Sequence, residues 1–231
     1  MPFLTRDAAV WTLFLGSEGV ELDPQNPENR FHPDWIAAVH QQLDTIEAGD
    51  DKTSVVITAT GKFFSNGLDV DYVAANADKL PQYLDLVHGL YQRLLSFSRP
   101  VVAAVNGHAF GAGAMLVLCA DHRIMRSERG FWSLPEIHLG MPFTDPMSAL
   151  LRTRLLDATA TEAMTTGRRY GGAQAQALGI VDQVVDVDAL ATLSTAEAAD
   201  RAATAGPALA TVKSNLRGPL LQVMSQPTPP L

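Results

Sequence analysis

Two glycine-containing turns are the segments of this sequence whose residues could hold a reacting group. The first turn runs Lys-Phe-Phe-Ser-Asn-Gly-Leu-Asp over residues 62–69, and the second runs Asn-Gly-His-Ala-Phe-Gly-Ala-Gly over residues 106–113. Each follows a run typical of a buried strand and precedes a helix, which predicts two strand–turn–helix units. Backbone N–H groups at a helix start lack internal partners, and two of them aimed at one oxygen would form an oxyanion hole. Plain structural turns are the alternative.

One carboxylate close to these turns could move a proton. Glu136 follows Pro135 within an apolar segment, residues 131–139. An apolar setting raises the pKa of a carboxyl group and makes it a better proton shuttle near neutral pH. The alternative for Glu136 is a solvated loop acid.

Other polar residues near the turns are predicted to be structural. Asp69 follows the first turn and Asp145 precedes a proline, so both suit N-capping of a helix. For His108, in the second turn, a structural hydrogen bond is favoured over a role in the pocket. Ser65 lacks the Gly-x-Ser-x-Gly setting of a serine hydrolase. The histidines show no metal-ligand spacing, and we expect no metal.

Composition limits the classes of partner. The 231 residues include 17 Lys and Arg against 25 Asp and Glu, a formal charge of −8, which argues against nucleic acid or an anionic membrane as the main partner. The single cysteine, Cys119, is expected to be a small buried hydrophobe. The longest apolar run, residues 109–120, is too short to span a bilayer, and no signal-peptide pattern opens the chain. We therefore expect a cytoplasmic protein without a membrane partner.

The elements that must position these groups alternate between strand and helix. His32-Pro33 is expected to open the first long helix, which ends at Gly49. Residues 68–80 read as a polar, mobile stretch, and the chain beyond residue 146 reads as mostly helical. This order predicts an α/β fold with a largely parallel sheet. The expected strands cover residues 10–15, 54–60, 100–105, 123–125, 131–134 and a short insert at 180–181, and further helices cover 81–97 and 114–119.

Several segments, taken in order and spacing, resemble the enoyl-CoA hydratase/isomerase (crotonase) family. The resemblance covers roughly residues 8 to 215. The sequences of the first turn and of residues 129–131 are most similar to the short Δ3,Δ2-enoyl-CoA isomerase branch. The segments that carry it are residues 61–69, 100–107, 111–113, 121–124, 134–137 with Gly140, and 177–182.

The resemblance implies both a fold and a site. The fold would be a ββα spiral core over residues 1–185 with a helical trimerisation region over residues 186–231, assembled as a homotrimer or as a hexamer of two trimers. Glu136 would be the catalytic acid–base, and the backbone N–H groups of Leu68 and Ala112 would be the oxyanion donors. The substrate would be an acyl-CoA thioester, with coenzyme A as part of the substrate and no separate cofactor. The substrate-binding residues would be Lys62, Phe64, Gly67, Gly111, Met115 and Lys213, with surface cations the alternative for the two lysines.

Met115 separates two reactions within this family. Hydratases carry a second glutamate at the position of Met115, and hydration uses a pair of groups to activate water and to complete the proton transfer. A single glutamate suits a 1,3-proton shift, which favours an isomerase. Hydration, thioester hydrolysis and decarboxylation are the enzymatic alternatives, and a non-catalytic acyl-CoA-binding protein is the alternative from another class.

Overall fold

Two sheets form the centre of the computed structural model, which describes residues 1–49 and 51–229. The larger sheet has the strand order β1-β2-β3-β5-β7-β10, and the smaller has the order β4-β6-β8-β9. The β1–β2 and β8–β9 pairs are antiparallel and the other described pairs are parallel. The strands are β1 (Phe3–Asp7), β2 (Val10–Phe14), β3 (Ser54–Thr58), β4 (Phe63–Ser65), β5 (Val101–Val105), β6 (His108–Phe110), β7 (His122–Arg126), β8 (Trp132–Ser133), β9 (Arg169–Tyr170) and β10 (Gln183–Val185).

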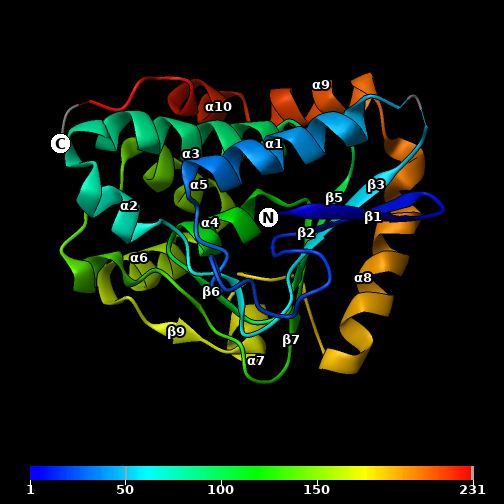
Figure 1. The fold of residues 1–231 in the computed structure, drawn as a ribbon, viewed down its shortest axis with the longest axis horizontal. Coiled ribbons are helices and arrows are strands. Elements are labelled where there is room, and N and C mark those ends of the chain that lie inside the picture. Colours follow the sequence, from blue (N-terminus) through cyan, green and yellow to red (C-terminus); the bar gives the residue numbers. More distant parts are fainter. Residues whose placement is uncertain (50, 230–231) are drawn as a thin grey trace.

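Helices cover both faces of the larger sheet (Figure 1). On one side α8 packs against β3, β5 and β7, while α1 and α3 lie on the other side. The α-helices are α1 (Pro33–Glu47), α2 (Val70–Ala75), α3 (Leu80–Leu95), α4 (Ala112–Cys119), α5 (Asp145–Arg154), α6 (Asp157–Thr166), α7 (Gly172–Ala177), α8 (Val187–Arg201), α9 (Pro207–Leu216) and α10 (Gly218–Met224). Three 3₁₀ turns, η1 (Ala77–Lys79), η2 (Pro135–Leu139) and η3 (Ala202–Thr204), complete the described elements.

The central strands explain why the larger sheet is buried on both faces. In β3, Val55 and Ile57 belong to the main core, while Val56 between them belongs to a second cluster with Leu190 and Ala198 of α8. Successive side chains of a strand point to opposite faces, so an uninterrupted apolar run suits a strand covered twice. The expected α/β class with a largely parallel sheet is confirmed.

The structure differs from the sequence-based expectation at several elements: β4 and β6 lie inside the two predicted turns, and β9 was not expected. β1 was not anticipated; it forms a hairpin with β2 through Ala8, whose φ is +48°. The stretch expected to be mobile, residues 68–80, contains α2 and η1. The strand expected at residues 180–181 lies three residues later, in β10. The division into two parts at residue 185 stays a prediction, and α8 beyond it packs on the same sheet as the strands before it.

Candidate active site

The two glycine turns lie side by side at one edge of the smaller sheet. β4 lies within the first predicted turn and β6 within the second; the two strands are parallel neighbours, and Gly67 and Gly111 each follow the end of one of them. Ligands of α/β proteins gather at the carboxyl ends of parallel strands, where turns expose main-chain groups. The pairing of β4 with β6 therefore brings the two predicted turns to a common place.

Glycines let the two turns touch through their backbones. A methyl group built on Gly67 would lie 2.7 Å from both the Ala112 nitrogen and the Phe110 oxygen. One built on Gly113 would lie 2.4 Å from the Ser65 oxygen. Gly67 also has a φ of +84°, a conformation that disfavours any residue with a side chain. The two turns are thus in direct contact through their main-chain atoms.

At the first turn, the N–H group of Leu68 is set apart from its neighbours. The Gly67 N–H donates to Ser65 Oγ at 3.1 Å, and the Asp69 N–H donates to the Tyr83 hydroxyl at 2.9 Å. Among the residues that the structure describes, the Leu68 N–H has no hydrogen-bond acceptor. Of three consecutive amides, the middle one is available to a ligand.

The second turn repeats this arrangement with different partners. The Gly111 N–H donates to the Ser133 oxygen at 3.0 Å, whereas the Ala112 N–H finds no acceptor in the described parts of the chain. Ala112 is the first residue of α4, where the helix dipole is positive. Each turn therefore offers one main-chain donor, at the two residues predicted to form the oxyanion hole.

The carboxyl group of Glu136 lies against the second turn. Glu136 is 8% exposed, and a methyl group built on Gly111 would lie 3.1 Å from its Oε1. Its Oε2 is buried without a hydrogen-bond partner among the described residues. Burial raises the pKa of Glu136 to about 7, partly opposed by its own backbone N–H. A carboxyl group with that pKa can accept and return a proton at neutral pH.

The remaining predicted binding residues take different places. Phe64 and Met115 are completely buried in the main core, from β4 and from the first turn of α4. Lys62 is exposed beside the first turn, with its ammonium 5.4 Å from the ring centre of Phe63.

Lys213 is not brought to the turns. It is 4% exposed, its ammonium donates to the Arg99 oxygen at 2.9 Å, and it forms an ion pair with Asp121. Arg217 pairs with the same carboxylate at 3.1 Å. This buried pairing differs from the contact with a ligand phosphate that was expected for Lys213, because the ammonium faces protein atoms. It fastens α9 to the core.

Two of the three predicted structural roles need correction. Asp69 caps α2 as expected, accepting from the Tyr72 N–H at 3.2 Å. The cap of α5 is Thr144, one residue before Asp145, because its hydroxyl accepts from the Met147 N–H. His108 lacks the expected structural hydrogen bond, since its buried Nδ1 has no partner among the described residues. Its ring instead stacks on Phe131 at 5.6 Å.

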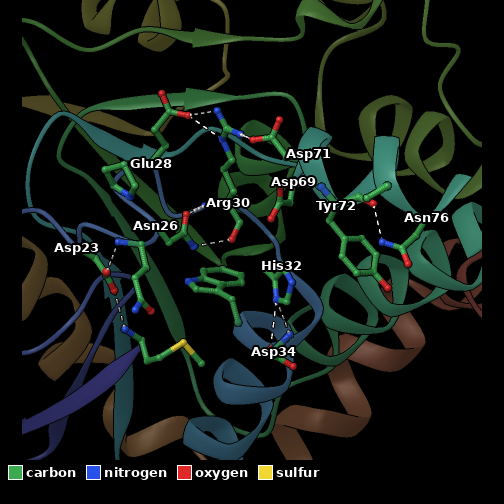
Figure 2. A pocket seen from close by; sticks show the side chains of 15 residues that line it. Asp23, Asn26, Glu28, Arg30, His32, Asp34, Asp69, Asp71, Tyr72 and Asn76 are labelled. Carbon is green, nitrogen blue, oxygen red and sulfur yellow. Dashed lines mark hydrogen bonds and ion pairs between the residues drawn. The ribbon is translucent and has the colours of Figure 1, made fainter.

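Two cavities that no sequence pattern marked are lined by other residues. The larger, about 770 Å³, is lined by residues of the segment before α1 and by α2, and Figure 2 shows Arg30 bridging Glu28 and Asp71 within it. It reaches the first turn at Asp69. The smaller, about 560 Å³, lies between the start of α5 and the segment after α10. Glu136 lines neither of these two cavities.

The described residues form neither a metal cluster nor a membrane-spanning helix. Within 1–49 and 51–229, no three His, Cys, Asp or Glu side chains gather in a way that could hold a metal ion. None of the described helices combines the length and apolar character needed to cross a bilayer.

Solved structures define the class of this fold. Human mitochondrial Δ3-Δ2-enoyl-CoA isomerase superposes with a TM-score of 0.85 at 23% identity, over 96% of this chain and 84% of that one. The chain thus has the α/β crotonase fold, with two sheets and C-terminal helices, as the resemblance implied.

Sequence comparison names the family. The chain belongs to the enoyl-CoA hydratase/isomerase family, whose model matches residues 19–226. It is similar to enoyl-CoA delta isomerase 3 of Arabidopsis thaliana, with 34% identity over 82% of this chain and 84% of the relative. It is also similar to the peroxisomal enoyl-CoA delta isomerase 2 of the same plant, with 36% identity over 67% and 68%. It is therefore a crotonase-family acyl-CoA enzyme, an enoyl-CoA isomerase or hydratase.

Proposed function

We propose that this enzyme is a Δ3,Δ2-enoyl-CoA isomerase. The Glu136 carboxylate removes a proton from C2 of a 3-enoyl thioester, and the electron pair of that C–H bond moves into a dienolate. The amides of Leu68 and Ala112 hold the negative charge on the thioester oxygen. Glu136 then returns the proton to C4, so that the double bond lies between C2 and C3 and the carboxylate is regenerated.

The number of carboxylates supports isomerisation over hydration. The family's hydratases have a second glutamate where this chain has Met115, and here that side chain is fully buried in the main core. Water addition would lack the second group, whereas a 1,3-shift needs one carboxylate with a pKa near neutrality. Glu136, with a pKa of about 7, has this property. The names of the two Arabidopsis relatives agree with the proposal.

Main chain and two apolar side chains form the proposed binding surface. Gly111 would let the thioester approach the backbone beside Glu136, and Gly67 would contribute by keeping the two turns in contact, with Phe64 and Met115 behind the turns. Lys62 would contact a phosphate of coenzyme A from its exposed position beside the first turn. Coenzyme A belongs to the substrate, so the mechanism uses no further cofactor.

Product analysis tests the reaction. The purified protein is incubated separately with a 3-enoyl-CoA and with a 2-enoyl-CoA, and the products are identified by mass and by absorbance. We expect the first ester to be converted to its 2-enoyl isomer and the second to gain no water. Rapid hydration of the 2-enoyl ester without isomerisation would assign the enzyme to the hydratases instead.

A single variant separates an enzyme from a binding protein. Glu136→Gln keeps the size of the side chain but removes the base, so we expect kcat to fall by about 10³-fold or more. Binding of the CoA ester, measured by calorimetry, should persist because the main-chain donors are untouched. Full activity in this variant would contradict the proposed role of Glu136.

Assembly and location complete the proposal. We propose a homotrimer or a dimer of trimers, which sedimentation velocity would distinguish from a monomer. The cytoplasmic location predicted from the sequence stays a prediction, and the peroxisomal name of one relative supplies the alternative. Fractionation of cells that produce the protein would decide between them.

A further inference from the structure

Helix α3 carries two buried tyrosines whose hydroxyl groups reach the two glycine turns. The Tyr83 hydroxyl accepts from the Asp69 N–H and donates to the Phe31 oxygen, both at 2.9 Å. The Tyr91 hydroxyl donates to the Ala112 oxygen at 2.8 Å. Both residues are at most 2% exposed. One helix therefore makes a hydrogen bond to each of the turns that provide the proposed oxyanion donors.

Tyr83 is bonded next to the first donor. Asp69 directly follows Leu68, and on the other side of Leu68 the Gly67 N–H is taken by Ser65 Oγ at 3.1 Å. The Phe31 carbonyl accepts the hydrogen bond from the Tyr83 hydroxyl. The Phe31 N–H in turn donates to the Gly67 oxygen at 2.8 Å. The peptide units on both sides of the Leu68 amide are thus fixed, and that amide has little freedom to turn away from a ligand.

Tyr91 is bonded to the residue that provides the second donor. Its hydroxyl donates to the Ala112 carbonyl oxygen, and burial, with a smaller contribution from the charge of Glu136, raises the pKa of Tyr91. α3 packs against α4, the helix that Ala112 begins. Because buried hydroxyl groups without a partner are costly, these bonds resist displacement of the turn.

We infer that Tyr83 and Tyr91 are positioning residues that set the separation of the two oxyanion donors through one rigid helix. The inference rests on the proposed function, since it concerns the polarisation of a thioester carbonyl. The eight residue steps from Tyr83 to Tyr91 correspond to about 12 Å along a helix axis, a distance that helical hydrogen bonds hold nearly constant. Catalysis is sensitive to displacements of about 1 Å at such donors.

Phenylalanine substitutions test the inference with readouts beyond stability. In Tyr83→Phe and in Tyr91→Phe we expect kcat for a 3-enoyl-CoA to fall about 10-fold, less than the loss of a whole donor, with KM changed less than about threefold. The infrared carbonyl stretch of a bound saturated acyl-CoA, labelled with ¹³C at the thioester, should move back toward its value in solution.

Matched controls separate positioning from packing. Tyr170→Phe also removes a hydroxyl bond from a fully buried tyrosine, in this case to Glu162 at 2.9 Å, and should leave the carbonyl frequency unchanged. 3-Fluorotyrosine at position 83 keeps the hydroxyl group and should retain wild-type kcat. Should one Phe variant fail to fold, the other tests the same inference at its own turn.

The outcomes distinguish this inference from the proposed reaction. Folded Phe variants with wild-type kcat and carbonyl frequency would overturn the positioning role, even if the wild type isomerises 3-enoyl esters. A wild-type protein that isomerises no ester would overturn the proposed function, whereas the carbonyl measurement, which needs only binding, would still test the tyrosines.

Discussion

At the scale of single residues, the burial of Glu136 links activity to pH. Its pKa is raised to about 7 by desolvation, and the proposed mechanism begins with the carboxylate. We therefore expect kcat/KM to fall about tenfold per pH unit below pH 7 and to level off above it. Steady-state rates between pH 5 and pH 9 would show this limb. A limb near pH 4.5 would mean that the working carboxyl group is exposed in the active enzyme.

The same pKa shift predicts how stability depends on pH. The folded-state pKa of Glu136 lies above the ordinary value of 4.5, so the folded protein binds the proton more tightly than the unfolded chain. The contribution of the protonated group is fully present below pH 4.5 and is lost as the pH rises through 7, by about 3 kcal/mol. Glu136→Gln should therefore be more stable than the wild type at pH 8.

Urea unfolding at two pH values measures this effect. The stability difference between Glu136→Gln and the wild type should shrink as the pH is lowered from 8 to 5. A difference that is the same at both values would show that the substitution acts through packing.

The sequence predicted a buried carboxyl group at Glu136, and the structure buries it for a partly different reason. The apolar flanks were expected to bury the carboxyl group, and Trp132 and Leu134 are indeed fully buried. Ile137 and Leu139, however, are 52% and 60% exposed. The carboxyl group is buried because η2 places it against Gly111, a contact between segments that side-chain types along the chain do not reveal.

At the scale of elements, the contact between the turns predicts a severe effect for one added methyl group. In Gly67→Ala the methyl group would lie 2.7 Å from main-chain atoms of the second turn, and the φ of +84° would be strained. We expect a loss of about 3 kcal/mol or more in the free energy of unfolding, together with loss of turnover.

Gly89→Ala is the matched control. Gly89 lies within α3, and a methyl group there meets no atom within 4 Å. Alanine favours a helix interior over glycine, so this variant should gain about 0.5–1 kcal/mol. Thermal unfolding of both variants checks the pair, and equal stability of the two would mean that the turns separate easily.

Elements with strong apolar patterns were predictable, and those without them were not. α1, α3, β3 and β5 have buried apolar positions at helical or continuous spacing, and they lie within a few residues of the predicted ranges. β1 and α2 contain no buried residues, so no pattern marked them. The role of Asn29 was likewise not predictable from the sequence, because its side-chain amide donates to the Phe63 and Phe64 oxygens, which are distant in the chain.

At the scale of the whole molecule, a buried ionic cluster holds the C-terminal helices. Asp121 forms ion pairs with Lys213 of α9 and with Arg217, the residue directly after α9. Its carboxylate also accepts a hydrogen bond from the Val101 N–H at 2.9 Å. This cluster connects segments far apart in the chain. The sequence therefore allowed Lys213 to be interpreted as a surface cation or a ligand contact, but not as a partner of Asp121.

Lys213→Met tests this structural role against phosphate binding. Removing the buried ammonium leaves Asp121 with Arg217 as its remaining cationic partner, so we expect a loss of about 2 kcal/mol and a melting temperature lower by about 5 °C. KM for the CoA ester should stay the same. Lys62→Met, at an exposed position, should do the reverse and raise KM with little effect on melting. A raised KM in Lys213→Met at wild-type stability would restore Lys213 as a ligand contact.

In the proposed site, main-chain amides would bind the thioester oxygen and a side chain would move the proton, which has a consequence for redesign. The part of the site that would activate the thioester consists of amides whose places depend on missing Cβ atoms, so it survives changes of neighbouring side chains. In the proposed mechanism, the chemistry that follows activation depends on the residues at positions 115 and 136. We expect variants at these two positions to keep the main-chain donors that would stabilise an enolate and to differ in the reaction that follows. Screening a combinatorial library at both positions for hydratase or hydrolase products would test this.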